Sequence, residues 1–356
     1  MSATKEHFHD QIEAGQRSKQ HKISWLNMPG YKPETWNPIV GCSKVSPGCD
    51  NCYAERMANR LTGIQATKDN YSPVISNGKW NGNTSACLNQ WNWPLVWKAP
   101  RMVFVCSMGD LFHESVSFET IEQIYDMMLA NDQHIFIVLT KRPERMYEFW
   151  DWLLRKTGGV GIQDVCLKSK NNIWQGVTAE NQEQANKRIP ILLSIPAAKR
   201  FVSIEPMLGP VDLTAIRPFI CETITQNALS GFATNQTKSF RDGLPVLDWV
   251  ICGGESGPKA RPMHPYWVSS IRYQCKAASV PFFFKQWGEW RPAIDSDSAK
   301  SNRWSWICKN GKVEPGLGRT WEFEKLHHSL MINVGRKAAG DLIDGERHQN
   351  WPKINL

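Results

Sequence analysis

The chain has 356 residues, of which 41% are hydrophobic and 21% charged, and this composition is typical of a globular protein with a large core. Its 42 Lys and Arg residues against 34 Asp and Glu residues give a net charge of +8, which permits a nucleic-acid partner without requiring one. No apolar run is long enough to span a bilayer, and the polar N-terminus lacks the apolar stretch of a secretion signal, so we expect a cytoplasmic protein without a membrane partner.

A short strand is predicted at residues 38–41, and a dense group of cysteines follows it. Six residues separate Cys42 from Cys49, and two separate Cys49 from Cys52. The other cysteines, at positions 87, 106, 166, 221, 252, 275 and 308, are scattered. Disulfides are rare in the cytoplasm, so the cluster indicates a metal site. The Pro47-Gly48 turn can bring Cys42 back toward the pair, and a helix beginning near Ala54 would favour thiolates at its N-terminus.

Three kinds of metal site are compatible with these thiols. Structural zinc usually needs four protein ligands, so Cys87 or a histidine would have to complete the set. A redox iron–sulfur cluster usually takes four cysteines. A cluster held by three cysteines leaves one iron without a protein ligand, and that iron can bind the amino and carboxylate groups of S-adenosylmethionine (SAM).

Further along the chain, after a predicted loop or lid at residues 62–99, apolar runs alternate with helical patterns. The runs cover residues 102–106, 134–139, 172–177, 200–204, 248–252 and 280–284, and the helices cover residues 117–130, 143–154, 179–193 and 265–278. Continuous apolar runs predict strands buried on both faces, and their alternation with helices predicts parallel βα units. Right-handed crossovers then leave either a barrel or a doubly wound sheet. We interpret residues 213–245 as an insertion into a domain of residues 1–290, and residues 291–356 as an extension packed on its core.

Polar residues gather directly after each of these six apolar runs. They include Gly109-Asp110, Lys141-Arg142, Thr178 with Glu180, Glu205, Gly254-Glu255 and Lys285-Gln286-Trp287. In α/β barrels the loops that follow the strands build the active site, whereas an open sheet collects them at a switch point. Any single polar cluster is expected of a loop that faces water. Six in succession predict a shared functional site.

The segment WNPIVGCSKVSPGCDNCYAERM at residues 36–57 resembles the three-Cys-motif protein family of phages and prophages, a radical-SAM-like branch of largely unknown function. The similarity continues through GDLFHE (109–114), LTKRPERM (139–146), GVTAENQ (176–182), RFVSIEPMLGP (200–210), DWVICGGESGPKARPMHP (248–265) and PFFFKQWGEW (281–290), and reaches the tail at residues 335–352. The resemblance therefore covers nearly the whole chain.

The resemblance implies a parallel (βα) barrel of radical-SAM type, partial or complete, with a 4Fe-4S cluster on Cys42, Cys49 and Cys52 and with SAM as cofactor. In that superfamily a Gly-rich acidic motif after the second strand binds the SAM amino group, and Gly109 and Asp110 stand at the matching place. Residues after the fourth and fifth strands hold the ribose and methionine parts, which suggests Thr178, Glu180, Ser203 and Glu205. The six-residue spacing between the first two cysteines departs from the three residues that are commonest in the superfamily.

We therefore expect a radical SAM-type enzyme that modifies or repairs a nucleic-acid base or a nucleotide, with a reductant such as flavodoxin. The residues predicted to be catalytic are Cys42, Cys49, Cys52, Lys141 and Glu255, and those predicted to bind substrate are Arg142, Gly254, Lys285, Gln286 and Trp287. The basic side chains would meet phosphates, and Trp287 would stack a base. Alternatively, Lys141 and Arg142 pair with Glu144 or Glu205, and Trp287 belongs to the core. The alternative function is a metal-containing nucleic-acid-binding accessory protein that works with a companion protein of the three-Cys-motif system.

Overall fold

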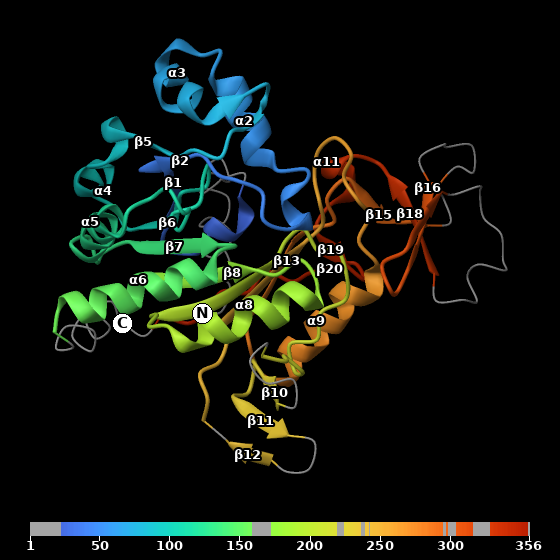
Figure 1. The fold of residues 1–356 in the computed structure, drawn as a ribbon. Helices are drawn as coiled ribbons and strands as arrows, with labels where there is room; N and C mark the ends of the chain where they lie inside the picture. The colour runs from blue at the N-terminus through green and yellow to red at the C-terminus, as the bar shows by residue number, and fades with distance from the viewer. Residues whose placement is uncertain are drawn as a thin grey trace, which may run out of the picture.

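The computed structural model describes residues 23–158, 172–218, 224–235, 239–241, 243–294, 297, 304–315 and 328–354. Its centre is a parallel sheet of seven strands (Figure 1). These are β1 (Lys32–Trp36), β6 (Arg101–Val105), β7 (Ile135–Thr140), β8 (Ile173–Thr178), β9 (Lys199–Ile204), β13 (Trp249–Gly253) and β14 (Phe282–Gln286). The six strands predicted from apolar runs are all present, each displaced by no more than two residues.

The strands lie side by side in the order in which they occur in the chain, which excludes the reversal of a doubly wound sheet. The sheet curls into a half-barrel. Four helices follow the strands, and Figure 1 shows three of them, α6, α8 and α9, along one side of the sheet. The four are α5 (Phe118–Leu129), α6 (Pro143–Lys156), α8 (Gln182–Ser194) and α9 (Pro265–Ala277). The prediction of a partial parallel (βα) barrel is thus confirmed.

The first strand is not where the sequence predicts it. Residues 38–41 contribute only β2 (Ile39–Val40), which pairs antiparallel with β5 (Ser85–Ala86). The first strand of the large sheet is β1, whose sequence KPETW contains a proline and two charged residues. This is tolerated because β1 pairs with β6 alone and is an edge strand, fully buried only at Trp36.

Side chains alternate between the two faces of the sheet and form a hydrophobic core on each face. On the concave face, aromatic rings fill the barrel near the N-terminal ends of the strands. The Trp249 ring packs edge-on against Trp25, Trp174 and Phe283, and its indole nitrogen donates to the carbonyl of Asn350 at 2.8 Å. On the convex face, mainly aliphatic side chains pack against the helices. The open end of the barrel is therefore at the C-terminal ends of the strands.

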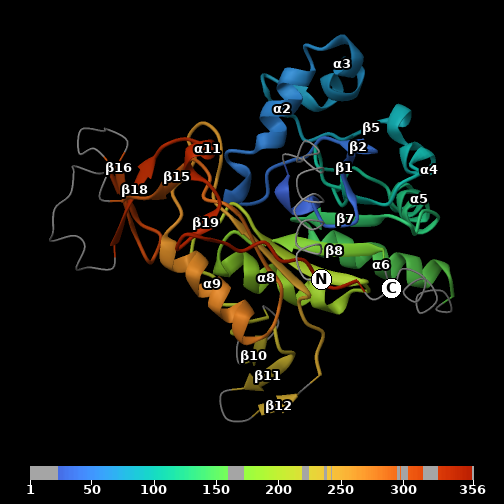
Figure 2. The ribbon, with the colours of Figure 1, turned by 180° about the vertical axis from the view of Figure 1, so that it is seen from behind.

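Two segments leave the barrel at opposite ends of the molecule, as Figures 1 and 2 both show. At one end lies α2 (Tyr53–Leu61). The residues after it, predicted as a loop or lid, form short elements instead. These are α3 (Gln65–Tyr71), η3 (Ser72–Val74), the hairpin of β3 (Ile75–Ser76) and β4 (Lys79–Trp80), β5, η4 (Leu88–Gln90) and α4 (Trp93–Val96). At the other end the predicted insertion contains an antiparallel sheet of β10 (Ile224–Asn227), β11 (Phe232–Asn235) and β12 (Ser239–Arg241).

The C-terminal part consists of a small sheet and a return to the barrel. The sheet contains β15 (Trp290–Pro292), β18 (His328–Asn333), β16 (Trp304–Cys308) and β17 (Val313–Pro315) in that spatial order, and α11 (Arg336–Ala339), β19 (Leu342–Ile343) and β20 (Glu346–Arg347) follow it. The chain then runs along β14, where the Phe284 amide donates to the carbonyl of His348. The Trp351 indole nitrogen donates to the carbonyl of Trp25, in η1 (Ser24–Leu26). Among the described helices, none has the length and apolarity that crossing a membrane requires.

Candidate metal centre

The three clustered cysteines lie on residues 41–53, a segment that we call the cysteine loop and that connects β2 to α2. Cys49 ends the short helix η2 (Pro47–Cys49), and Cys52 directly precedes α2, so the predicted helix starts one residue before Ala54. All three cysteine residues are half-buried. The loop lies over the C-terminal ends of the parallel strands, because hydrogen bonds tie it to residues that follow β6, β7, β8 and β13.

The loop begins with a close approach of two glycine backbones. Gly41 adopts φ +96°, pairs with Gly109 in an isolated parallel bridge, and donates its amide to the carbonyl of Met108 at 3.1 Å. A Cβ atom on Gly109 would lie 2.9 Å from the Gly41 carbonyl oxygen and 3.1 Å from the Cα of Val40. Gly109, predicted to bind the cofactor, is therefore the residue whose missing side chain lets the loop reach the strand ends.

We expect Gly109→Ala to lower the free energy of unfolding by about 1–3 kcal/mol, because the new methyl group meets backbone atoms that cannot rotate away. Urea denaturation measures this change. The matched control is Gly63→Ala, whose added Cβ would have its nearest neighbour at 3.5 Å and should leave stability within about 0.5 kcal/mol. Equal effects of the two substitutions would contradict the packing argument.

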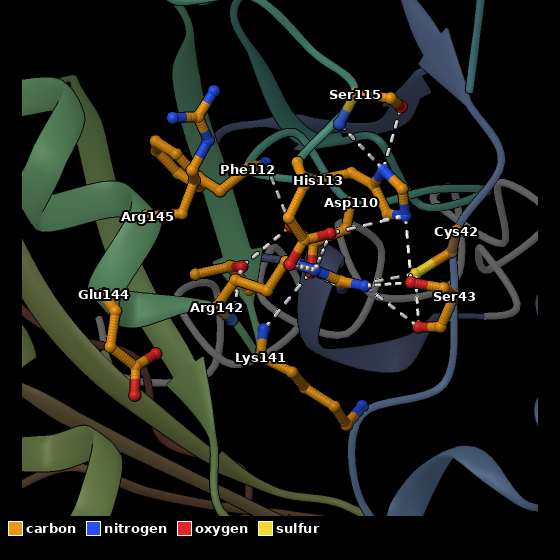
Figure 3. Close-up of polar contacts among 12 residues, drawn as sticks. Cys42, Ser43, Asp110, Phe112, His113, Ser115, Lys141, Arg142, Glu144 and Arg145 are labelled. Atoms are coloured by element: carbon orange, nitrogen blue, oxygen red, sulfur yellow. Dashed lines mark hydrogen bonds and ion pairs between the residues drawn. The ribbon is translucent and has the colours of Figure 1, made fainter. Parts of the chain in front are cut away.

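The first contact between the loop and the strand ends is made by Arg142, which follows β7 and is 4% exposed (Figure 3). Its Nη1 lies 3.1 Å from Oδ2 of Asp110 and 3.5 Å from Sγ of Cys42. Its Nη2 donates to the carbonyl oxygen and to Oγ of Ser43, at 3.1 and 2.7 Å. Its Nε donates to Glu114 at 3.0 Å. One guanidinium thus joins the Cys42 end of the loop to the ends of two strands.

Neutral groups complete this contact. Thr140 Oγ1 donates to Asp110 at 2.7 Å, and His113 Nε2 lies 2.9 Å from Oγ of Ser43. Because the Ser115 amide donates to His113 Nδ1, the ring proton belongs on Nε2. Burial and the Arg142 charge lower the pKa of His113, which keeps the ring neutral. Sequence reasoning missed Ser43, His113 and Glu114, although two of them lie in the GDLFHE motif.

The environment of Cys42 opposes a free thiolate. Burial raises the pKa of this thiol to about 12, and the Asp110 carboxylate acts in the same direction. The Arg142 charge and hydrogen bond oppose the increase, while the nearby Cys52 adds to it. A metal ion that binds here must therefore displace a proton from Cys42.

The second contact is made by Glu180, which follows β8. Its side chain is fully buried with that of Arg188, and Oε2 lies 2.9 Å from the Arg188 Nη1. Its Oε1 accepts the amide of Gly48, next to Cys49, at 3.0 Å. Although burial favours the neutral acid, Arg188 and these hydrogen bonds hold the pKa of Glu180 below its ordinary value. Predicted to bind the cofactor, this carboxylate instead supports the turn before Cys49.

The third contact is made by Glu255, which follows β13 and is predicted to be catalytic. Its Oε2 accepts the side-chain amide of Asn51 at 3.0 Å and Nε of Arg261 at 2.9 Å. Arg261 in turn lies 3.2 Å from the Asp50 carboxylate and donates to the carbonyl of Pro47 at 2.9 Å. Although burial opposes the charge, the hydrogen bonds from Arg261 lower the pKa of Glu255. Sequence reasoning missed Arg261, which lies six residues beyond Glu255 in a loop.

Together these contacts fix the loop at each of its cysteines. Arg142 holds the segment at Cys42, Glu180 the turn before Cys49, and Glu255 with Arg261 the residues between Cys49 and Cys52. After Cys52, the Tyr53 hydroxyl donates to the carbonyl of Ser107 at 2.6 Å. The polar residues after four different strands thus hold one loop.

A second group of predicted residues lies on the concave face beneath the loop. Along β9, Ser203 and Glu205 follow Phe201 at every second position, so all three point to the same side. Thr178 is the register partner of Ser203 on β8. Lys285, from β14, forms an ion pair with Glu205. These polar residues form a layer between the aromatic rings and the open end.

Lys141, which is predicted to be catalytic, directly follows β7 and precedes Arg142. Lys141 is half-buried, and its side chain points away from the ion pairs around Arg142 (Figure 3). Within the described ranges it has no acidic partner, because Glu144 pairs with Lys187 and Glu205 with Lys285. Lys141 is therefore free to meet an anionic ligand.

Gly254 and Trp287 serve packing rather than an exposed surface, whereas Gln286 is half-buried and contributes its backbone carbonyl to the same contact. The Trp287 side chain is 6% exposed, packs against Phe284, and donates its indole N–H to the carbonyl of Leu342. Its ring is not available to stack on a base, which contradicts the predicted role and fits the alternative of a core residue. A Cβ atom on Gly254 would lie 1.9 Å from the Trp287 carbonyl oxygen, and the Gly254 amide donates to the carbonyl of Gln286. These residues join β13 to the end of β14.

The thiols of the cysteine loop are a soft donor set that suits an iron–sulfur cluster or zinc. Over the part of the chain that the structure describes, no three His, Cys, Asp or Glu side chains are gathered as a ready metal-binding group. The described cysteines Cys87, Cys106, Cys252 and Cys275 are buried in apolar clusters, and Cys166 and Cys221 lie outside the described residues. Within the described residues, the cysteine loop itself carries three thiols, whereas a closed zinc site takes four protein ligands.

Comparison with known proteins gives one match. A family model described as "Protein of unknown function (DUF5131)" matches residues 20–352. No curated protein and no solved structure matches the chain.

Proposed function

The chain belongs to the DUF5131 family, and because that family carries no assigned activity, we propose a function from the geometry of the site. In this proposal Cys42, Cys49 and Cys52 hold a 4Fe-4S cluster in which one iron has no protein ligand. The protein is then a radical SAM-type enzyme of the phage three-Cys-motif kind, and its substrate is a nucleic-acid base or a nucleotide.

The observation that carries the proposal is the support of one loop from four strands. Two carboxylates, Glu180 and Glu255, and two arginines, Arg142 and Arg261, make hydrogen bonds to the backbone or side chains around the three cysteines, and all but Arg261 are largely buried. Ordering such a loop costs conformational entropy, and a binding site gains when the fold has ordered its ligands in advance. A loop that only connected β2 to α2 would need none of this support.

The number of thiols favours an open cluster. Zinc in a structural site takes four protein ligands, and no fourth thiol among the described cysteines lies in the loop. When bound, a cluster with an open iron supplies an electron to SAM, which cleaves the sulfonium and yields a carbon radical. A reductant such as flavodoxin would supply that electron, and a companion protein of the three-Cys-motif system is the expected partner.

The concave face offers this chemistry a layer of polar side chains beneath the loop, of which Thr178 and Ser203 are buried. Thr178, Ser203, Glu205 and Lys285 provide hydroxyl, carboxylate and ammonium groups that suit SAM or a polar substrate. Lys141, without an acidic partner among the described residues, suits a substrate phosphate. In this proposal Glu180 and Glu255 bind residues of the cysteine loop directly, and Asp110 acts on the loop by orienting Arg142.

Anaerobic reconstitution with iron and sulfide, followed by reduction in the presence of SAM, tests the enzymatic part of the proposal. We expect 5′-deoxyadenosine from the wild type and none from Cys52→Ala, which removes one thiol at the N-terminus of α2. Cys275→Ala, which changes a buried cysteine outside the loop, should retain the product. Protein that carries a complete cluster and does not cleave SAM would contradict the radical SAM assignment.

One observation favours the alternative of a metal-containing nucleic-acid-binding accessory protein. The acidic residues expected to bind SAM, Asp110, Glu180 and Glu205, are engaged with Arg142, Arg188 and Lys285. A structural zinc would leave those pairs undisturbed. Anaerobic purification that yields one zinc and no iron would select this alternative.

A further inference from the structure

We infer that Arg142 is a positioning residue that also sets the reduction potential of the cluster. The inference rests on the proposed function, because it concerns the cluster on Cys42, Cys49 and Cys52. It assigns to Arg142 a role toward the metal centre in place of the phosphate contact that the sequence predicts.

The geometry distinguishes Arg142 from the other cations near the loop. Its Nη1 donates to Sγ of Cys42 at 3.5 Å, and in the described residues this is the one side-chain cation with a hydrogen bond to a cysteine of the loop. The guanidinium is 4% exposed and keeps its charge at every working pH. Asp110 and Glu114 fix its orientation from two sides, so the charge cannot swing into water.

Electrostatics gives the direction of the effect. Reduction adds one electron to a cluster, and a positive charge with an N–H donor at a ligand sulfur stabilises the reduced form. Removal of the Arg142 charge would also leave the Asp110 and Glu114 carboxylates facing the cluster without compensation. Both changes make the cluster harder to reduce.

Arg261 provides a matched control within the same loop. It too binds a strand-end carboxylate, that of Glu255, and it too donates to a loop carbonyl, that of Pro47. Its contacts include the Asp50 carboxylate but no sulfur of the loop. A substitution at Arg261 therefore loosens the loop without removing a donor from a cluster ligand.

The experiment compares midpoint potentials, by redox titration with electron paramagnetic resonance, of the reconstituted wild type, Arg142→Gln and Arg261→Gln. We expect Arg142→Gln to shift the reduction equilibrium toward the oxidised cluster by about tenfold or more, which is about 59 mV for one electron. Arg261→Gln should shift it by less than half as much in millivolts. Equal potentials for the two variants would overturn the inference.

Arg142→Gln leaves Asp110 buried without its partner, and the variant could fail to fold for that reason. In that case the two lysine variants, Arg142→Lys and Arg261→Lys, provide the comparison. Arg142→Lys retains the charge, but its three N–H donors cannot serve Asp110, Glu114, Ser43 and Cys42 together, so its potential should still fall below that of Arg261→Lys. A wild type that binds no cluster would remove the proposed function itself. A stable cluster whose potential ignores Arg142 would remove only the present inference.

Discussion

Glu180→Gln is expected to lower the free energy of unfolding by about 3–5 kcal/mol, the cost of leaving one partner of a buried ion pair unpaired. Neither side chain of the pair reaches solvent beyond 2%, so water cannot solvate the Arg188 guanidinium once the carboxylate is gone. The new amide also has a single oxygen for two donors. If that oxygen accepts from Arg188, the NH2 group faces the Gly48 amide, and if it accepts from Gly48, the NH2 group faces Arg188. Urea denaturation followed by circular dichroism measures the loss.

Two variants separate this effect from a general sensitivity of α8. Glu183→Gln changes an exposed carboxylate on the same helix and should alter stability by no more than about 0.5 kcal/mol. Adding Arg188→Met to Glu180→Gln removes the orphaned charge and should recover part of the loss. A loss below about 1 kcal/mol for Glu180→Gln alone would mean that the pair behaves like an exposed one.

The barrel could be predicted because its strands carry a strong signal. Each of the six predicted strands is a continuous apolar run, since one face packs against aromatic rings and the other against helices. The strand β1 has no such run, because among its residues only Trp36 is buried. Residues 62–99 form short elements that hydrogen-bond to one another in pairs, such as β3 with β4, and elements this short show no periodic pattern that would predict them.

The site could be located but its internal roles could not. Adjacent residues after β7 show why: the Arg142 side chain turns toward Asp110 and Ser43, whereas the Lys141 side chain points away from these contacts. Sequence position places both at the open end and does not decide between these directions. Arg261 is a further case, because only the folded loop brings it between Glu255 and the segment that holds Cys49.

The carboxylates illustrate the same limit in chemical terms. An acid at a strand end suits a cofactor amine and suits an arginine equally well, and the choice depends on which cation the fold brings within hydrogen-bond distance. For Glu180 that cation is Arg188, eight residues further on and on the helix that follows. For Glu205 it is Lys285, from a strand two places away in the sheet. The motif predicts the place, and the packing decides the partner.

Cys49→Ala is expected to abolish cluster binding with little change in the loop. Cys49 stands between two supported points, since the Gly48 amide is bound by Glu180 and the Asp50 carboxylate by Arg261. The substitution therefore removes one of three thiols while the backbone around it stays held. The matched control is Cys308→Ala, which removes a partly exposed cysteine on β16, outside the loop.

The iron and acid-labile sulfide content of anaerobically purified and reconstituted protein tests the central claim most directly. The cluster on Cys42, Cys49 and Cys52 predicts about four iron and four sulfide per chain in the wild type and in Cys308→Ala, and close to none in Cys49→Ala. One zinc per chain without iron, or equal iron in the wild type and in Cys49→Ala, would contradict it.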